Sequence, residues 1–189
     1  MDYNKNLWDK YTDDNKNNIF ERLPDFFYNV AITLGVSSIC EAGCNVGNNL
    51  SSMPTTLSVS GFDLNEYALQ TTKSRYPNFD LKLGNILDIP FPDNSFDLVF
   101  TRGVLIHIPE KDLDGAMQEL MRISKKWIFN LEYFGEDEKM INWKRGDDLL
   151  WYRNMKKRWS KFDVEIISDV EIPYSIDSSK SRFTLVKKF

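Results

Sequence analysis

The sequence predicts a single α/β domain with a doubly wound, mostly parallel sheet. Short apolar runs, typical of buried strands, alternate along the chain with segments that have helical periodicity. The first run, near 36–41, leads into a turn with two glycines, and the second ends in an acid at Asp63. Strands that alternate with helices favour parallel pairing, because each helix returns the chain to the edge of the sheet where it started.

Composition and charge narrow the class of protein. The chain has 189 residues, of which 42% are apolar and 14% aromatic, enough for a substantial core. Its net charge of −4 disfavours a nucleic-acid partner, since binding to nucleic acid draws on clustered Lys and Arg. We therefore expect a small-molecule substrate and no nucleic-acid partner.

Cysteine use and hydropathy indicate the compartment. Cys40 and Cys44 fall on a predicted buried strand and its turn, no apolar run has the length of a membrane span, and we recognise no signal sequence. We expect a cytoplasmic, reduced protein without a membrane partner. The sequence leaves the oligomeric state open, a homo-oligomer included.

Residues 1–35 are predicted to form an N-terminal lid and a helix. The first eighteen residues are polar but contain Trp8 and Tyr11, a pattern that fits a frayed end or a lid equally well. Apolar residues then recur on one helical face from Ile19 to Leu34, and Gly35 stands where that helix should end. This helix is expected to pack on the sheet.

The turn after the first strand is predicted to bind a ligand. Gly43 and Gly47 allow positive φ angles and a close approach of the ligand to the backbone, and the following polar stretch offers unpaired N–H groups. Asp63 lies twenty residues after Gly43, at the tip of the second strand, where a carboxylate is placed to accept two hydrogen bonds from a ribose diol. The ligand is therefore predicted to contain a nucleoside.

The residues of this turn favour S-adenosylmethionine over a dinucleotide. Asn45 and Asn48 stand where a dinucleotide fingerprint has glycines, and Glu41 would repel phosphates yet suits an amino group or a sulfonium. Two alternatives stay open. An NAD-dependent oxidoreductase would use the same Asp63, and a catalytically silent cofactor-binding partner subunit would keep Glu41 and Asp63 without turnover.

The remaining elements continue the alternation. A helix from Glu66 to Tyr76 and a strand near 80–83 come first, followed by a strand from Phe96 to Thr101, a helix from Pro109 and a strand from Trp127 to Leu131. The last two strands, Val164 to Ile172 and Arg182 to Lys187, are expected to pair antiparallel.

Four segments resemble the motifs of the class I S-adenosylmethionine-dependent methyltransferases: residues 41–47, Asp63, residues 84–91 and residues 94–99. The resemblance implies a Rossmann-like, seven-stranded sheet with an antiparallel last strand, spanning 36–189, and methyl transfer from S-adenosylmethionine. Residues 103–108, 131–133 and 145–150 are similar to the methylases associated with pseudaminic acid biosynthesis, a bacterial surface-sugar pathway. That similarity implies a sugar or sugar-nucleotide acceptor, a precursor of bacterial surface glycans.

The residues predicted to bind the cofactor follow these motifs. They are Glu41, Gly43, Cys44, Asn45, Gly47, Asp63, Leu64, Asn85, Ile86 and Arg102. In the family, the side chain at the position of Asn85 and the backbone at Ile86 reach the adenine edge, where Asn can both donate and accept. Arg102 is predicted to neutralise the methionine carboxylate or an acidic acceptor.

The catalytic residues are predicted at the carboxyl ends of the fourth and fifth strands, where open α/β sheets bind ligands. His107, the only histidine, is placed to take a proton from an acceptor hydroxyl or amine, with a structural role as the alternative. Tyr133 is predicted to orient the acceptor and Glu132 to bind its hydroxyl or amine. The reaction requires no metal.

Residues from about 135 to 160 are predicted to be an insertion that shapes the acceptor site. A helix is expected to begin at Arg145 and to carry an apolar stripe as far as Phe162. Trp143 and Arg145 are predicted to bind the substrate, because a flat ring suits a sugar face and a forked donor suits an acid group. The alternative for this aromatic stripe is core packing.

Overall fold

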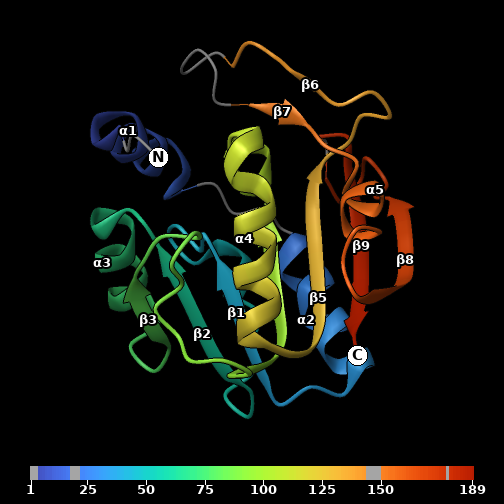
Figure 1. Ribbon diagram of the computed structural model, residues 1–189. Coiled ribbons are helices and arrows are strands. Elements are labelled where there is room, and N and C mark those ends of the chain that lie inside the picture. The colour runs from blue at the N-terminus through green and yellow to red at the C-terminus, as the bar shows by residue number, and fades with distance from the viewer. Residues whose placement is uncertain (1–3, 18–21, 144–149, 178) are drawn as a thin grey trace.

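One sheet organises the chain (Figure 1). The structure, a computed structural model, describes residues 4–17, 22–143, 150–177 and 179–189. Within them the strands of the main sheet are β1 (Ser38–Ala42), β2 (Ser58–Asp63), β3 (Asp80–Leu83), β4 (Phe96–Arg102), β5 (Ser124–Tyr133), β8 (Val164–Glu171) and β9 (Ser181–Lys188). Their order is β3-β2-β1-β4-β5-β9-β8. Strands β1 to β5 are parallel, and β9 is antiparallel to both of its neighbours, which confirms the predicted fold.

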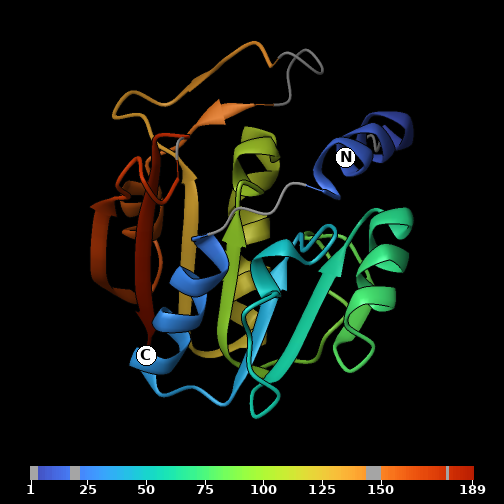
Figure 2. The same ribbon diagram turned by 180° about the vertical axis from the view of Figure 1, so that it is seen from behind.

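Helices cover both faces of this sheet. They are α1 (Lys5–Asn15), α2 (Leu23–Leu34), α3 (Glu66–Arg75), α4 (Glu110–Ile123) and α5 (Met155–Trp159), with short 3₁₀ turns η1 (Asn48–Leu50) and η2 (Leu105–His107). Helices α4 and α5 lie on the face toward the viewer in Figure 1, and α2 and α3 lie on the face seen in Figure 2. This arrangement is the doubly wound one, which places the β-to-α loops at the carboxyl ends of the parallel strands.

Each face of the sheet has its own apolar core. Leu113 and Met117 of α4 pack with Trp159 of α5 on one face. On the other face, Phe27 of α2 stacks on Phe129 with ring centroids 5.6 Å apart. Because the central strands are largely buried on both sides, they are mainly apolar, as expected for a parallel sheet, with polar residues such as Glu41 and Thr101 buried among them.

Local signals mark the helix ends, and α2 begins at Leu23, later than the expected start near Ile19. Helix α2 has Pro24 in its first turn and ends at Gly35, whose φ of 64° is left-handed and costs glycine little. Helix α3 begins after Asn65, whose side chain accepts a hydrogen bond from the N–H of Tyr67 at 2.9 Å. Strand β5 begins earlier than predicted, so that Lys125 lies in the strand instead of at the end of a helix.

Helix α1 docks on the loops at the carboxyl end of the sheet. Thr12 is fully buried, and its hydroxyl accepts a hydrogen bond from Asn65 Nδ2 at 3.1 Å. The hydroxyl of Tyr67 donates to Asp13 at 2.8 Å, and Asn48 Nδ2 donates to the carbonyl of Asn15 at 3.2 Å. Residues 5–15 are therefore a docked helix and not a frayed end.

The long helix predicted from Arg145 is wrong over the part that the structure describes. Arg145 itself lies among residues 144–149, outside the described residues. Beyond them, β7 (Trp151–Tyr152) pairs with β6 (Lys139–Met140), and only α5 is helical. The side chain of Asn154 caps α5 by accepting from the N–H of Lys157 at 3.0 Å, which starts the helix there. The predicted apolar stripe thus combined residues of β7 with the buried face of the five-residue helix α5.

Candidate active site

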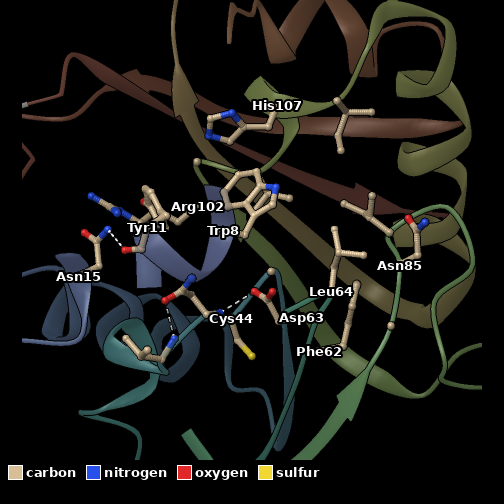
Figure 3. A pocket seen from close by; sticks show the side chains of 18 of the residues that line it. Trp8, Tyr11, Asn15, Cys44, Phe62, Asp63, Leu64, Asn85, Arg102 and His107 are labelled. Carbon is tan, nitrogen blue, oxygen red and sulfur yellow. Dashed lines mark hydrogen bonds between the residues drawn. The ribbon is translucent and has the colours of Figure 1, made fainter. Parts of the chain in front are cut away.

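A pocket of about 320 Å³ lies at the carboxyl ends of the parallel strands (Figure 3). Its walls come from α1, the turn after β1, the tip of β2, the loop after β3 and the loop after β4. It contains eight of the ten predicted cofactor-binding residues: Gly43, Cys44, Asn45, Asp63, Leu64, Asn85, Ile86 and Arg102. Segments from residue 43 to residue 102 therefore meet around a single cavity, as the motifs predicted.

The turn after β1 needs glycine for reasons of space. Gly43 and Gly47 have φ angles of 73° and 74°. A Cβ atom on Gly43 would lie 2.6 Å from Val104 Cγ2, and one on Gly47 would lie 2.6 Å from Thr72 Cγ2. Gly47 does not line the pocket, so its role is to let the turn pack against α3. Asn45 is also left-handed, with φ 43°, and its side chain accepts from the N–H of the next residue, which suits asparagine.

Asp63 holds this turn and faces the pocket (Figure 3). Its Oδ2 accepts from the N–H of Asn45 at 2.8 Å, and its Oδ1 accepts from the N–H of Asn65 at 2.8 Å. Burial raises the pKa of Asp63, and the backbone N–H groups oppose that rise. A carboxylate has about four lone-pair sites, so these two bonds leave each oxygen able to accept from a ribose hydroxyl.

Glu41 lies behind the turn and does not line the pocket. Its side chain is 0% exposed, and its Oε1 accepts from Nδ2 of Asn49, a lining residue, at 2.6 Å. Within the described part of the chain, Oε2 has no hydrogen-bond partner. Burial raises the pKa of Glu41 to about 8. The predicted interaction with an amino group would therefore run through Asn49, which sequence reasoning did not single out.

The raised pKa of Glu41 makes folding stability depend on pH. Because the folded pKa of about 8 lies above the ordinary value of 4.5, the folded protein keeps a proton that the unfolded chain has released. This group should lower the free energy of unfolding by roughly 5 kcal/mol at most as pH rises from 4.5 to 8. We expect Glu41→Gln to be more stable than the wild type at pH 8, with the difference shrinking toward pH 5, as measured by urea unfolding.

The exposed Glu136 offers a matched control for this measurement. The free energy of unfolding of Glu136→Gln should depend on pH as that of the wild type does, because this substitution leaves the buried Glu41 in place. If the difference in stability between Glu41→Gln and the wild type were constant from pH 5 to pH 8, Glu41 would not titrate in that range.

His107 lies at the wall that this larger pocket shares with a second, smaller cavity. Its side chain is 8% exposed. The imidazole contacts the ring of Trp8 with centroids 5.2 Å apart and the ring of Trp143 with centroids 4.8 Å apart. Figure 3 shows Trp8 of α1 between His107 and the turn after β1. The imidazole thus borders the pocket from the side opposite Asp63.

Glu132 differs from its prediction because it lines neither cavity. Its Oε1 accepts from the hydroxyl of Thr101 at 2.7 Å and from the N–H of Val104 at 3.2 Å, and its Oε2 accepts from the N–H of Ile106 at 3.3 Å. The carboxylate is buried, which raises its pKa. Glu132 therefore holds the loop that carries His107 and borders neither cavity in which an acceptor could lie.

The second cavity, of about 60 Å³, adjoins the larger pocket. The two share Tyr11, Arg102, Gly103 and His107 as lining residues. The predicted residues Tyr133 and Trp143 line the smaller cavity, while Arg145 lies outside the described residues. Asp177 also lines it, and sequence reasoning missed this residue because no motif marks the polar loop that carries it.

None of the described helices combines the length and the apolar character that a membrane crossing requires. In the same residues, no group of three or more His, Cys, Asp or Glu side chains is arranged to hold a metal ion.

Comparison with known proteins agrees with this geometry. Residues 40–127 match the methyltransferase domain family. A sterol 24-C-methyltransferase of Gibberella zeae is 25% identical over 162 residues, which are 82% of this chain and 40% of that protein. An uncharacterized methyltransferase of Schizosaccharomyces pombe is 43% identical over 53 residues, 28% of this chain and 18% of that protein. The chain thus spans less than half the length of these curated relatives.

Solved structures match the fold at low sequence identity. An S-adenosylmethionine-dependent methyltransferase from Clostridium acetobutylicum superposes with a TM-score of 0.71 at 11% identity, covering 96% of this chain and 98% of that one. Magnesium protoporphyrin IX methyltransferase from Synechocystis, solved with bound SAH, gives a TM-score of 0.68 at 13% identity, covering 88% and 82%. Residues 40–127, just under half of the chain, therefore match a methyltransferase domain, and the solved structures share the fold of this chain.

Proposed function

We propose that this protein transfers a methyl group from S-adenosylmethionine to a small polar acceptor. The main support is the convergence of the glycine turn, Asp63 and the Asn85–Ile86 segment on one pocket of about 320 Å³. Asp63 would accept hydrogen bonds from the ribose diol, and Asn85 with Ile86 would meet the adenine edge. Arg102 lines the same pocket and would neutralise the methionine carboxylate.

The cofactor supplies a methyl group activated by a cationic sulfur, so the protein's work is to hold the acceptor in line with that carbon. Positioning of this kind can supply about 7–11 kcal/mol of the barrier. As the acceptor atom bonds to the methyl carbon, the carbon–sulfur bond breaks and the acceptor loses a proton. His107 borders both cavities and would accept that proton, while Tyr133 would orient the acceptor.

Helix α1 would act as a lid over the bound cofactor. Its Trp8 and Tyr11 line the pocket, and Thr12 is buried against the loops beneath them. A lid that excludes water would protect the cationic sulfur and fix the methyl group near His107. The contacts of Asp13 and Asn15 with neighbouring loops support this closed position.

A sugar or sugar-nucleotide precursor of bacterial surface glycans is the acceptor we propose. The support is the similarity of residues 103–108 and 131–133 to the methylases associated with pseudaminic acid biosynthesis. Trp143 and Tyr133 line the smaller cavity, where their flat rings would contact the part of the sugar that enters it.

Cofactor binding and turnover test this function separately. We expect S-adenosylhomocysteine to raise the melting temperature, and NAD to leave it unchanged because Asn45 and Asn48 stand where a dinucleotide-binding turn has glycines. Turnover would then be measured as S-adenosylhomocysteine release with a panel of sugars and nucleotide-activated sugars. Stabilisation by NAD alone would favour an oxidoreductase, and cofactor binding without release for any acceptor would favour a silent partner subunit.

A further inference from the structure

Asp177 places a buried carboxylate in the smaller cavity. It lies in the loop between β8 and β9, and it is 5% exposed. Its Oδ1 accepts from the N–H of Ser179 at 2.9 Å, which fixes the side chain. Its Oδ2 has no hydrogen-bond partner among the described residues. A buried carboxylate oxygen without a donor costs free energy, so a ligand that donates a hydrogen bond there recovers that cost.

Arg102 gives the same cavity a positive charge. Its Nη2 lies 3.9 Å from Asp177 Oδ1, and both residues line the cavity. An ammonium group entering beside Asp177 would therefore also meet a guanidinium, which repels it. A hydroxyl carries no charge to repel, and it can donate to the carboxylate while a neighbouring oxygen faces the arginine.

The cavity is also placed for the acceptor of the reaction. Tyr11, Arg102 and His107 line both cavities, so a molecule held by Asp177 lies directly beside the cofactor pocket. The volume of about 60 Å³ suits one polar group of the acceptor and not a whole sugar ring.

We propose that Asp177 determines acceptor specificity by accepting a hydrogen bond at Oδ2 from an acceptor hydroxyl. The acceptor class is then a molecule in which a hydroxyl adjoins a second oxygen, either a vicinal diol or an α-hydroxy acid. This inference rests on the proposed methyl transfer and narrows its substrate. Asp177 takes no part in the proton transfer, which remains with His107.

Small probes test the inference without knowledge of the natural acceptor. Glycolate carries a hydroxyl beside a carboxylate, glycerol carries vicinal hydroxyls, acetate lacks the hydroxyl, and ethanolamine adds an ammonium. Each would be titrated into the complex with S-adenosylhomocysteine while the indole N–H signals are followed by NMR, because Trp143 lines the cavity. We expect glycolate or glycerol to bind more tightly than acetate and ethanolamine. The stronger of the two hydroxyl probes tells a hydroxy acid from a diol.

Asp177→Asn keeps the shape of the side chain and removes its charge. We expect it to weaken the stronger hydroxyl probe by about ten- to hundredfold, the range for a hydrogen bond to a charged group. Acetate should not be weakened, because its carboxylate loses a neighbouring negative charge. Asp163→Asn, at an exposed position before β8, is the matched control and should bind all probes as the wild type does. Asp177→Ser provides a second, smaller variant should the asparagine variant fold poorly.

The outcomes separate this inference from the proposed function. Normal binding of S-adenosylhomocysteine with unchanged affinity for the hydroxyl probes in both Asp177 variants would overturn the role of Asp177 alone. Three other results would also overturn it. Ethanolamine could bind more tightly than glycolate and glycerol, Asp177→Asn could weaken acetate as much as the hydroxyl probe, or no probe could bind. Failure of the wild type to bind S-adenosylhomocysteine would instead overturn the proposed function.

Discussion

Replacing Asp63 with alanine is expected to weaken binding of S-adenosylhomocysteine by about 10²–10⁴-fold. Two ribose hydroxyls would each lose a hydrogen bond to a charged acceptor, and each such bond contributes about 1.5–3 kcal/mol. No other carboxylate can replace Asp63 at the tip of β2, because the other described acid that lines the pocket, Asp112, lies on α4. Isothermal titration calorimetry measures the change directly.

Asp63 also holds the turn through Asn45 and Asn65, so the alanine variant combines two losses. Asp63→Asn separates them, since it keeps one acceptor oxygen and the shape of the side chain while removing the charge. Asp80→Ala, at the exposed start of β3, is the control and should bind the cofactor product normally. Unchanged affinity in Asp63→Ala would mean that the adenosyl group lies elsewhere.

Local signals explain why so much of the fold follows from sequence. The central strands are mainly apolar, and residues such as Gly35 and Asn65 mark the helix ends with short-range chemistry. The helix predicted between Arg145 and Phe162 failed for the converse reason. Met155 and Trp159 are one turn apart and buried together, so their spacing is helical, but the residues before Asn154 pair as a hairpin. A short helix and a strand in sequence can imitate one long helix.

In the site, too, residues set by local sequence could be predicted and residues set by distant contacts could not. The glycine turn and Asp63 could be predicted, because one short motif and one strand tip carry them. Asp177 could not be predicted, because it is seventy-five positions from Arg102 in the sequence. The two residues meet only once β9 has paired with β5. Glu132 was assigned wrongly to the acceptor, since its place at a strand tip says nothing of the partners that bury it.

These partners form a hydrogen-bonded chain that sets the position of the loop that carries His107. Trp159 Nε1 donates to Asn130 Oδ1 at 2.5 Å, Asn130 Nδ2 donates to Thr101 Oγ1 at 2.8 Å, and the Thr101 hydroxyl donates to Glu132. Glu132 in turn accepts from the backbone of the loop that leads to His107. Buried polar groups are costly unless all are satisfied, so this chain favours one arrangement of the loop.

Removing the imidazole of His107 is expected to have the second large effect. If His107 takes the acceptor proton, His107→Ala should lower kcat by about 10²–10⁴-fold, the usual contribution of a positioned general base. Cofactor affinity should change little by comparison, because the predicted ribose and adenine contacts lie at Asp63 and Asn85. Turnover is measured as S-adenosylhomocysteine release with the best acceptor from the panel.

The pH profile distinguishes a base from a residue that only fills space. Wild-type turnover should fall at acidic pH as the imidazole becomes protonated, and the residual turnover of His107→Ala should lack this decline. His107→Gln keeps a polar side chain of similar length that cannot take the proton. If proton transfer matters, the turnover of this variant should resemble that of His107→Ala. If His107 only packs against Trp8 and Trp143, its turnover should resemble that of the wild type. Full turnover of His107→Ala at both acidic and neutral pH would show that His107 is not the base. The acceptor proton would then pass to solvent, as is possible for an amine acceptor that needs no base.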